Sequence, residues 1–125
     1  MQEIKATIVE QKIISSSIFI SEDLSKKFEF SMQCKAKLKT SKDEEDKSVL
    51  LNIELTILTK DEKFNVKFVS FFIFKLDQLP DDYDNIAEEK LIPMAREALL
   101  DSLDEMLVTM GYSKMELAKR MCHET

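Results

Sequence analysis

Apolar and polar residues alternate along the N-terminal part of the chain, which predicts a β-sheet. The alternation is regular over residues 28–39 (FEFSMQCKAKLK) and 49–58 (VLLNIELTIL), and it begins regularly in residues 64–76 (FNVKFVSFFIFKL). Alternate side chains of a strand point to opposite faces, so each segment has one apolar face. Residues 6–20 (ATIVEQKIISSSIFI) are rich in β-branched residues, and their alternation slips near residues 15–17, as a bulge would cause. We therefore expect four strands, the first of them irregular.

Two polar segments separate the last three of these strands. Residues 40–47 (TSKDEEDK) form a charged loop, and residues 59–63 (TKDEK) form a short turn. Strands joined by such short polar connections pair as antiparallel hairpins. The second, third and fourth strands are therefore predicted to form an antiparallel meander.

The fourth strand is apolar on both faces over its second half. Its even positions are apolar from the start, and from residue 69 three odd positions, Val69, Phe71 and Ile73, become apolar as well. A single sheet with its helices on one side leaves its other face uncovered. We expect that a partner subunit or a bound client supplies the second layer.

A helical region follows Pro80 and a cluster of Asp and Asn residues. Its strongest part, residues 93–110, places Ala95, Leu99, Leu103, Met106, Leu107 and Met110 on one stripe. Pro93 either occupies the first turn or kinks a longer helix that begins near Asn85. Gly111 is expected to end the helix in a left-handed conformation, and Ser113 with Glu116 predicts a short second helix to about Cys122. Strands followed by helices give an α+β fold.

Length and charge limit the possible classes of protein. A chain of 125 residues with 44% apolar residues is expected to form one domain, residues 1–125. The net charge of −6 argues against general nucleic-acid binding, which needs clustered basic residues. The charge is uneven, because residues 26–42 hold six Lys against one Glu, and residues 81–105 hold nine acids against two basic residues. This asymmetry either orients a charged partner or reflects solvated faces.

No residue pattern predicts catalysis, a cofactor or a metal site. The one histidine, His123, adjoins Cys122 near the C-terminus, and side chains adjacent on a helix diverge. Residues 81–85 (DDYDN) lack the glycine and distal Glu of a calcium loop, so they are interpreted as a helix entry. Cys34 and Cys122 have no redox spacing, and no apolar run approaches the ~20 residues of a membrane span. We expect a reduced, cytoplasmic protein that is not an enzyme and does not insert into membranes.

The order of the segments resembles the SecB family of export chaperones. The resemblance rests on four strands, a Phe-rich fourth strand ending in FFIF, an acidic crossover, a helix opening with LIPMAREALL, and an MGY break. The family's P-x-A-R-E pattern corresponds to residues 93–97, and the similarity extends from about Ala6 to Met115. The compact end YSKMELAKRMCHET and the missing glycine-rich turns depart from the family pattern. The chain therefore resembles a distant, bacterial or phage, SecB-like relative.

The resemblance implies an ATP-independent chaperone, or holdase, that binds unfolded or nascent polypeptides. It also implies a homo-oligomer, either a dimer or a tetramer built as a dimer of dimers, with the SecA motor or an antitoxin as a further partner. The residues expected at client or subunit contacts are Phe68, Val69, Phe71, Phe72, Ile73, Phe74 and Leu79, with Tyr83 and Ile86 on the crossover loop. Glu54 is a candidate motor-facing acid, and the helix methionines are assigned to the core.

A second interpretation is a non-chaperone interaction protein of phage or mobile-element origin that uses the same fold to bind one folded partner. Promiscuity separates the two interpretations, because a holdase acts on several unrelated unfolded proteins, whereas a specific interaction protein acts on none of them.

Overall fold

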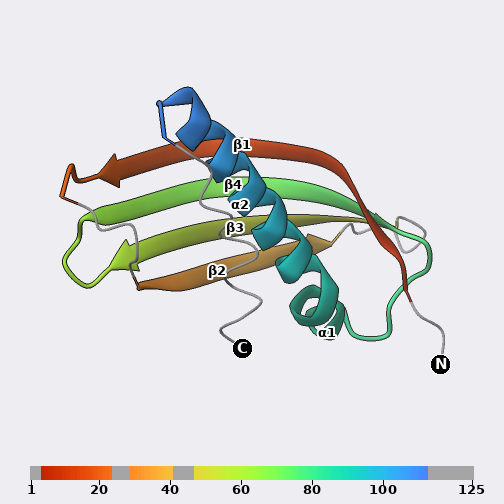
Figure 1. Ribbon diagram of the computed structural model, residues 1–125. Coiled ribbons are helices and arrows are strands. Elements are labelled where there is room, and N and C mark those ends of the chain that lie inside the picture. The colour runs from red at the N-terminus through yellow and green to blue at the C-terminus, as the bar shows by residue number, and fades with distance from the viewer. Residues whose placement is uncertain (1–3, 24–28, 41–46, 113–125) are drawn as a thin grey trace.

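The computed structural model describes residues 4–23, 29–40 and 47–112, which form one antiparallel sheet with helices on one face (Figure 1). The elements are β1 (Ala6–Ile20), β2 (Phe30–Thr40), β3 (Ser48–Thr59), β4 (Phe64–Leu76), α1 (Tyr83–Ile86), the π-helical segment η1 (Ala87–Leu91) and α2 (Ile92–Thr109). The predicted strands and the long helix are confirmed. The predicted short helix from Ser113 to about Cys122 lies outside the described residues.

The strands lie in the order β1-β4-β3-β2, so β1 and β2 form opposite edges of the sheet. The predicted meander is confirmed, because β2 pairs with β3 and β3 with β4, both antiparallel. The pairing of β1 with β4 adds a strand that the local pattern did not place. The two edge strands, β1 and β2, therefore lie three strand spacings apart, about 14 Å.

β1 is irregular, as its sequence predicted, but at two places. Its register against β4 shifts between Ile8 and Glu10 and again between Ile13 and Ser15. The extra residues at these bulges, Val9 and Ile14, are 62% and 60% exposed. Bulges bend and twist an edge strand and so discourage unwanted pairing with other chains.

The helical region is continuous from Tyr83 to Thr109, and Pro93 lies in the first turn of α2, directly after η1. Proline lacks an N–H and its ring crowds the carbonyl four residues earlier, and the wider π-helical turn before it accommodates both effects. Pro93 therefore occupies the first turn of α2, as one sequence interpretation had it, and the helical region also begins well before it, as the other had it. At the start of α1, the N-cap Asp82 accepts a hydrogen bond from the Asn85 N–H at 3.2 Å.

Gly111 ends α2 with a φ of 99°, as predicted. The Tyr112 N–H donates to the Leu107 carbonyl at 2.8 Å, and the Gly111 N–H donates to the Val108 carbonyl at 3.0 Å. These two bonds form a Schellman motif, which satisfies carbonyls that a helix end otherwise leaves without partners.

The core lies between α2 and one face of the sheet, which we call the helix-covered face. α2 crosses this face diagonally, from the β2 edge to the β1 edge (Figure 1). The even positions of β4 point into the core, where Phe64, Val66, Phe68, Phe72 and Phe74 are 0% exposed. The chain's own helix thus covers the even face of β4. The opposite face, which we call the outer face, carries the odd positions.

The buried stripe of α2 differs in detail from the predicted one. Ala95, Leu99, Leu103 and Leu107 are buried as expected, and Leu100 is buried as well. The acid Asp104 is also buried, whereas Met110 is 48% exposed and Met106 is half-buried. The prediction that the methionines pack in the core was therefore wrong for Met110, because the end of α2 reaches the edge of the sheet.

The turn between β3 and β4 is held by a carboxylate. The buried Thr59 hydroxyl donates to Asp61 Oδ1 at 2.8 Å, and the Lys63 N–H donates to the same oxygen at 3.2 Å. These hydrogen bonds hold the pKa of Asp61 below its ordinary value. The turn also keeps Glu62 in a left-handed conformation with a φ of 58°.

We expect the Asp61→Asn variant to lose stability at neutral pH but not in acid. A carboxyl whose pKa is lowered by folding adds stability above its ordinary value of about 4, and that stability is lost as the pH falls through the folded pKa. Urea midpoints of both proteins at pH 7 and about pH 2.5 test this. A difference between the two urea midpoints that is equally large at both pH values would contradict the role of the ionised carboxylate.

Candidate functional site

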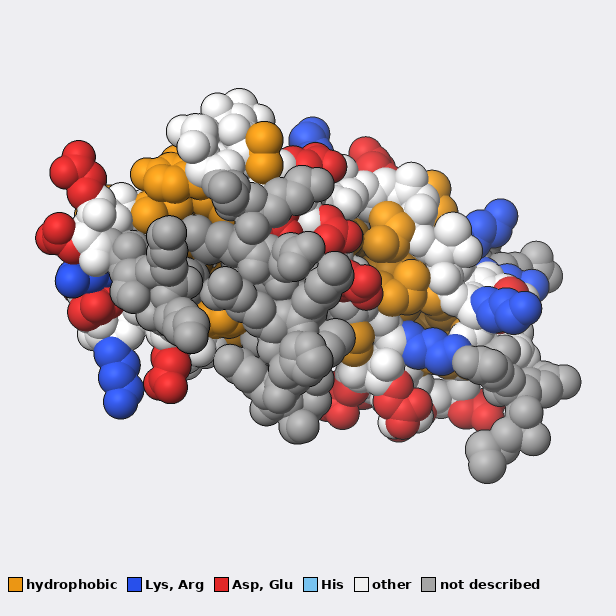
Figure 2. Space-filling model, viewed as in Figure 1, with side chains coloured by type: hydrophobic (Ala, Val, Ile, Leu, Met, Phe, Trp, Pro, Cys, Tyr) orange, Lys and Arg blue, Asp and Glu red, His pale blue; other side chains and the backbone are white. Residues whose placement is uncertain are grey.

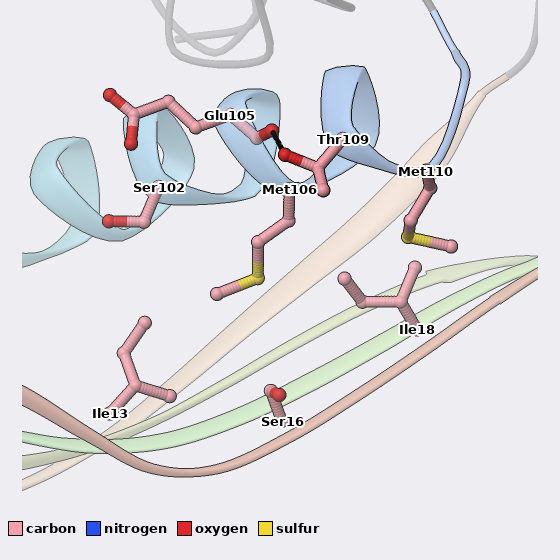
Figure 3. A pocket seen from close by; sticks show the side chains of 8 residues that line it. All are labelled: Ile13, Ser16, Ile18, Ser102, Glu105, Met106, Thr109 and Met110. Carbon is pink, nitrogen blue, oxygen red and sulfur yellow. Dashed lines mark hydrogen bonds between the residues drawn. The ribbon is translucent and has the colours of Figure 1, made fainter.

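An open apolar groove of about 600 Å³ lies between the last turns of α2 and the edge strand β1 (Figure 3). This volume is in the roughly 300–1,000 Å³ range of ligand pockets. Every fully buried strand side chain among the described residues belongs to β3 or β4, so neither edge strand, β1 nor β2, is fully covered by the helix. The groove is lined by Ile13, Ser16 and Ile18 of β1 and by Ser102, Glu105, Met106, Thr109 and Met110 of α2.

The two walls of the groove are apolar side chains of different kinds. Met106 and Met110 extend from α2 toward β1, where Ile13 and Ile18 lie opposite them (Figure 3). Figure 2 shows hydrophobic side chains on this face near the end of β1, close to the end of α2. Methionine is unbranched and polarizable, so it adapts to partners of varied shape. The walls therefore suit apolar side chains without selecting one of them.

The polar groups of the groove are mostly engaged within the chain. The Ser102 hydroxyl donates to the Ala98 carbonyl at 3.0 Å, and the Thr109 hydroxyl donates to the Glu105 carbonyl at 3.1 Å. Gln11 Nε2 donates to Ser102 Oγ at 3.3 Å and joins β1 to α2 beside the groove. Among the described residues that line the groove, Glu105 has the one charged side chain.

An acidic ridge runs along α2 to the groove. Glu97, Asp101 and Glu105 are all exposed and are spaced four residues apart, which places them on one face of the helix. The ridge therefore gives the apolar groove a negative rim. Such a rim attracts segments in which Lys or Arg adjoins apolar side chains.

Three of the predicted contact residues, Phe68, Phe72 and Phe74, lie in the core of this chain. Each is 0% exposed beneath α2, and the rings of Phe72 and Phe74 have centroids 6.0 Å apart. A client reaches these rings only if α2 moves away from the sheet. Their contact with a client or a second subunit stays a prediction.

The other three predicted positions of β4, Val69, Phe71 and Ile73, lie half-buried on the outer face. Leu50 of β3 pairs with Ile73 and extends this apolar stripe. The described helices all lie over the opposite face (Figure 1). The described part of the chain thus leaves the stripe without a second layer, as the sequence pattern indicated.

The remaining contact candidates follow β4. Leu79 is 45% exposed, Tyr83 is half-buried, and Ile86 is 6% exposed in the core. Tyr83 and Ile86 were expected on a crossover loop, but both lie in α1, because the Asp82 cap starts the helix earlier than the apolar stripe of residues 93–110 indicated. The predicted residues therefore occupy several surfaces, and none of them lines the groove.

Glu54, the candidate motor-facing acid, lies on the outer face in an ion pair. Its Oε1 is 3.0 Å from Lys67 Nζ, and the two side chains are 38% and 55% exposed. The hydrogen bond from Lys67, followed by the attraction of its charge, lowers the pKa of Glu54. The carboxylate is therefore ionised and neutralised by its neighbour. Its role toward a motor stays a prediction.

The described residues include no cluster of three or more His, Cys, Asp or Glu side chains that could hold a metal ion. Burial raises the pKa of the Cys34 thiol, and the charge of Arg96 opposes this only in part. Cys34 is therefore protonated at neutral pH and is not an activated nucleophile. Among the described helices, none combines the length and the apolar character needed to cross a bilayer.

The sequence reasoning missed the groove because it depends on two distant segments. Ile13 and Ile18 are ordinary strand residues, and Met106 and Met110 continue the apolar stripe of the helix. One available signal was that two of the seven methionines, Met106 and Met110, lie at the end of a helix stripe whose earlier large apolar positions are leucine. The diagonal path of α2 decides which of these side chains stay uncovered.

Neither a family model nor a curated protein sequence matches this chain. Among solved structures, the chain is similar to the Mycobacterium tuberculosis SecB-like chaperone Rv1957, which is in complex with a ChAD peptide from the Rv1956 HigA1 antitoxin. The TM-score is 0.67 at 5% sequence identity, over 88% of this chain and 86% of that chain. The chain therefore has the SecB-like fold that its sequence predicted.

Proposed function

We propose that this protein is an ATP-independent holdase that binds unfolded polypeptide segments in the groove between β1 and α2. The observation that carries the proposal is an open groove of about 600 Å³ with methionine and isoleucine walls, in a chain with the SecB-like fold. A structural relative with this fold binds an antitoxin peptide, which supports a polypeptide as the ligand.

The groove suits segments of varied sequence. Each buried CH₂ group contributes about 0.8 kcal/mol, so two or three apolar side chains in the groove give useful affinity without a specific hydrogen-bond pattern. The groove borders the edge strand β1, where an extended segment can add backbone hydrogen bonds along residues 15–20, the regular part of the strand beyond both bulges. The acidic ridge favours clients with Lys or Arg near their apolar residues. We infer cytoplasmic clients that are either export precursors or an antitoxin.

We also propose that the protein forms a homo-oligomer, a dimer or a dimer of dimers. Val9, Ile14 and Phe19 on the edge strand β1 are between 57% and 62% exposed. Large exposed apolar side chains along one edge favour contact with a second subunit. Light scattering at micromolar concentration measures the mass, and a stable monomer of 14.5 kDa would refute this part of the proposal.

The test of the holdase function is the suppression of aggregation. Three unrelated proteins are unfolded in denaturant and diluted into buffer without nucleotide, and their light scattering is followed. We expect slower aggregation of all three at near-stoichiometric ratios of this protein. Suppression of none of them, together with one tight folded partner in a pull-down, would support the specific interaction protein instead.

A further inference from the structure

The outer face of the sheet carries an apolar stripe. Val69, Phe71 and Ile73 follow one another on β4, and Leu50 of β3 pairs with Ile73. All four side chains are half-buried. With about 3.3 Å per residue, the stripe runs for about 13 Å along β4.

Lysines surround this stripe. The strand registers place on the outer face Lys12 of β1, Lys35, Lys37 and Lys39 of β2, and Lys67 and Lys75 of β4, and all six are exposed. The acids on the same face of the four strands are Glu10 and Glu54. Six lysines minus two glutamates give a local charge of +4 in a chain with a net charge of −6. The strands of the outer face therefore carry a net positive charge, whereas the whole chain has a net negative charge.

The register aligns the charges with the stripe. Lys37 of β2, Asn52, Phe71 and Lys12 of β1 form one row across the sheet, so lysines flank Phe71 from both edges. With about 4.8 Å between strands, Lys37 lies about 10 Å to one side of the stripe and Lys12 about 5 Å to the other. Glu54 is the acid closest to the middle of the face, and its charge is neutralised by the ion pair with Lys67.

We propose that the outer face docks an acidic segment of another protein, with apolar side chains on the Val69–Phe71–Ile73 stripe and carboxylates beside the flanking lysines. Charge complementarity selects this occupant. A nucleic acid fits less well, because its phosphates gain nothing from the apolar middle of the face. A second copy of the chain would join its acidic helix side to this face in a head-to-tail contact, which builds rings or open filaments rather than a two-fold dimer.

This inference goes beyond the holdase function, because the outer face and the groove lie on opposite sides of the sheet. A double variant, Met106→Gln with Met110→Gln, makes the groove polar and is expected to leave docking on the outer face unchanged. The two proposals can therefore fail independently.

The experiment measures binding of a fluorescein-labelled peptide that alternates glutamate with leucine and phenylalanine, followed by fluorescence anisotropy. We expect the Lys37→Glu variant to bind this peptide about fivefold more weakly than the wild type, because a flanking charge is reversed. Phe71→Ser is expected to weaken binding by a similar factor through the stripe. The affinity of the wild type should also fall as salt is raised.

The matched control is Lys60→Glu in the turn between β3 and β4. It makes the same change in net charge on an exposed residue outside the stripe, and we expect binding within twofold of the wild type. Equal weakening by Lys37→Glu and Lys60→Glu would overturn the proposal in favour of bulk charge. Tighter binding of a single-stranded oligonucleotide than of the peptide, or growth in mass of the protein alone at low salt, would overturn the choice of occupant.

Discussion

The Phe72→Ala variant is expected to lose about 3–5 kcal/mol of unfolding free energy, the range for removing a fully buried aromatic side chain. Phe72 is 0% exposed between the sheet and α2, and its ring packs beside that of Phe74. The loss is a large part of the roughly 5–15 kcal/mol that stabilises a typical domain. Urea unfolding followed by circular dichroism measures it, and we expect a partly unfolded protein at 37 °C.

The adjacent Phe71→Ala variant is the matched control, because it removes the same side chain from the other face of the same strand. Phe71 is half-buried on the outer face, so its loss should cost only about 1 kcal/mol. Equal losses for the two variants would show that a second protein layer already covers the outer face in solution. A larger loss for Phe71→Ala would reverse the assignment of the two faces.

The second large effect is expected in the groove. Met106→Gln combined with Met110→Gln keeps the length of both side chains but replaces apolar walls with polar amides. A client that buries apolar side chains there would leave the amides without partners, at roughly 1–3 kcal/mol for each. We therefore expect client affinity to fall at least tenfold, and the suppression of aggregation to disappear at stoichiometric ratios. Binding of an unfolded model client, measured by anisotropy, tests this.

Val108→Gln is the control for the groove. Val108 is 49% exposed on α2, two residues from Met106, so it lies on a different side of the helix and does not line the groove. We expect this variant to bind clients as the wild type does, and we expect all the variants to retain wild-type circular dichroism. Unchanged client binding by the double methionine variant would refute the groove as the client site.

Much of the architecture was predictable because it depends on local patterns. The bounds of β1 and β4 agree with the expected segments, and those of β2 and β3 differ from the expected ones by one or two residues. The end of the helix at Gly111 was likewise predictable, since only glycine adopts a backbone conformation with positive φ at low cost. The early helical turns before Pro93 were left undecided, because a proline either starts a helix or interrupts one.

The candidate site was less predictable. The double-sided apolar pattern of β4 correctly marked the outer face as uncovered in the described chain, but assigning Phe68, Phe72 and Phe74 to contacts did not anticipate their burial beneath α2. Met106 and Met110 were placed in the core because their spacing continues the helix stripe. Periodicity shows which face of a helix is apolar, but it does not show how far along the helix the sheet extends.

By itself, the sequence determined the strands, the meander, the helix and the excess of apolar surface on β4, because these depend on the backbone preferences and side-chain alternation of neighbouring residues. Only the tertiary structure decided that β1 joins β4, that α2 crosses the sheet diagonally, and that lysines from three strands gather around Phe71. Those features depend on contacts between segments distant in the chain. The groove and the basic outer face, which carry the proposed functions, both arise from such contacts.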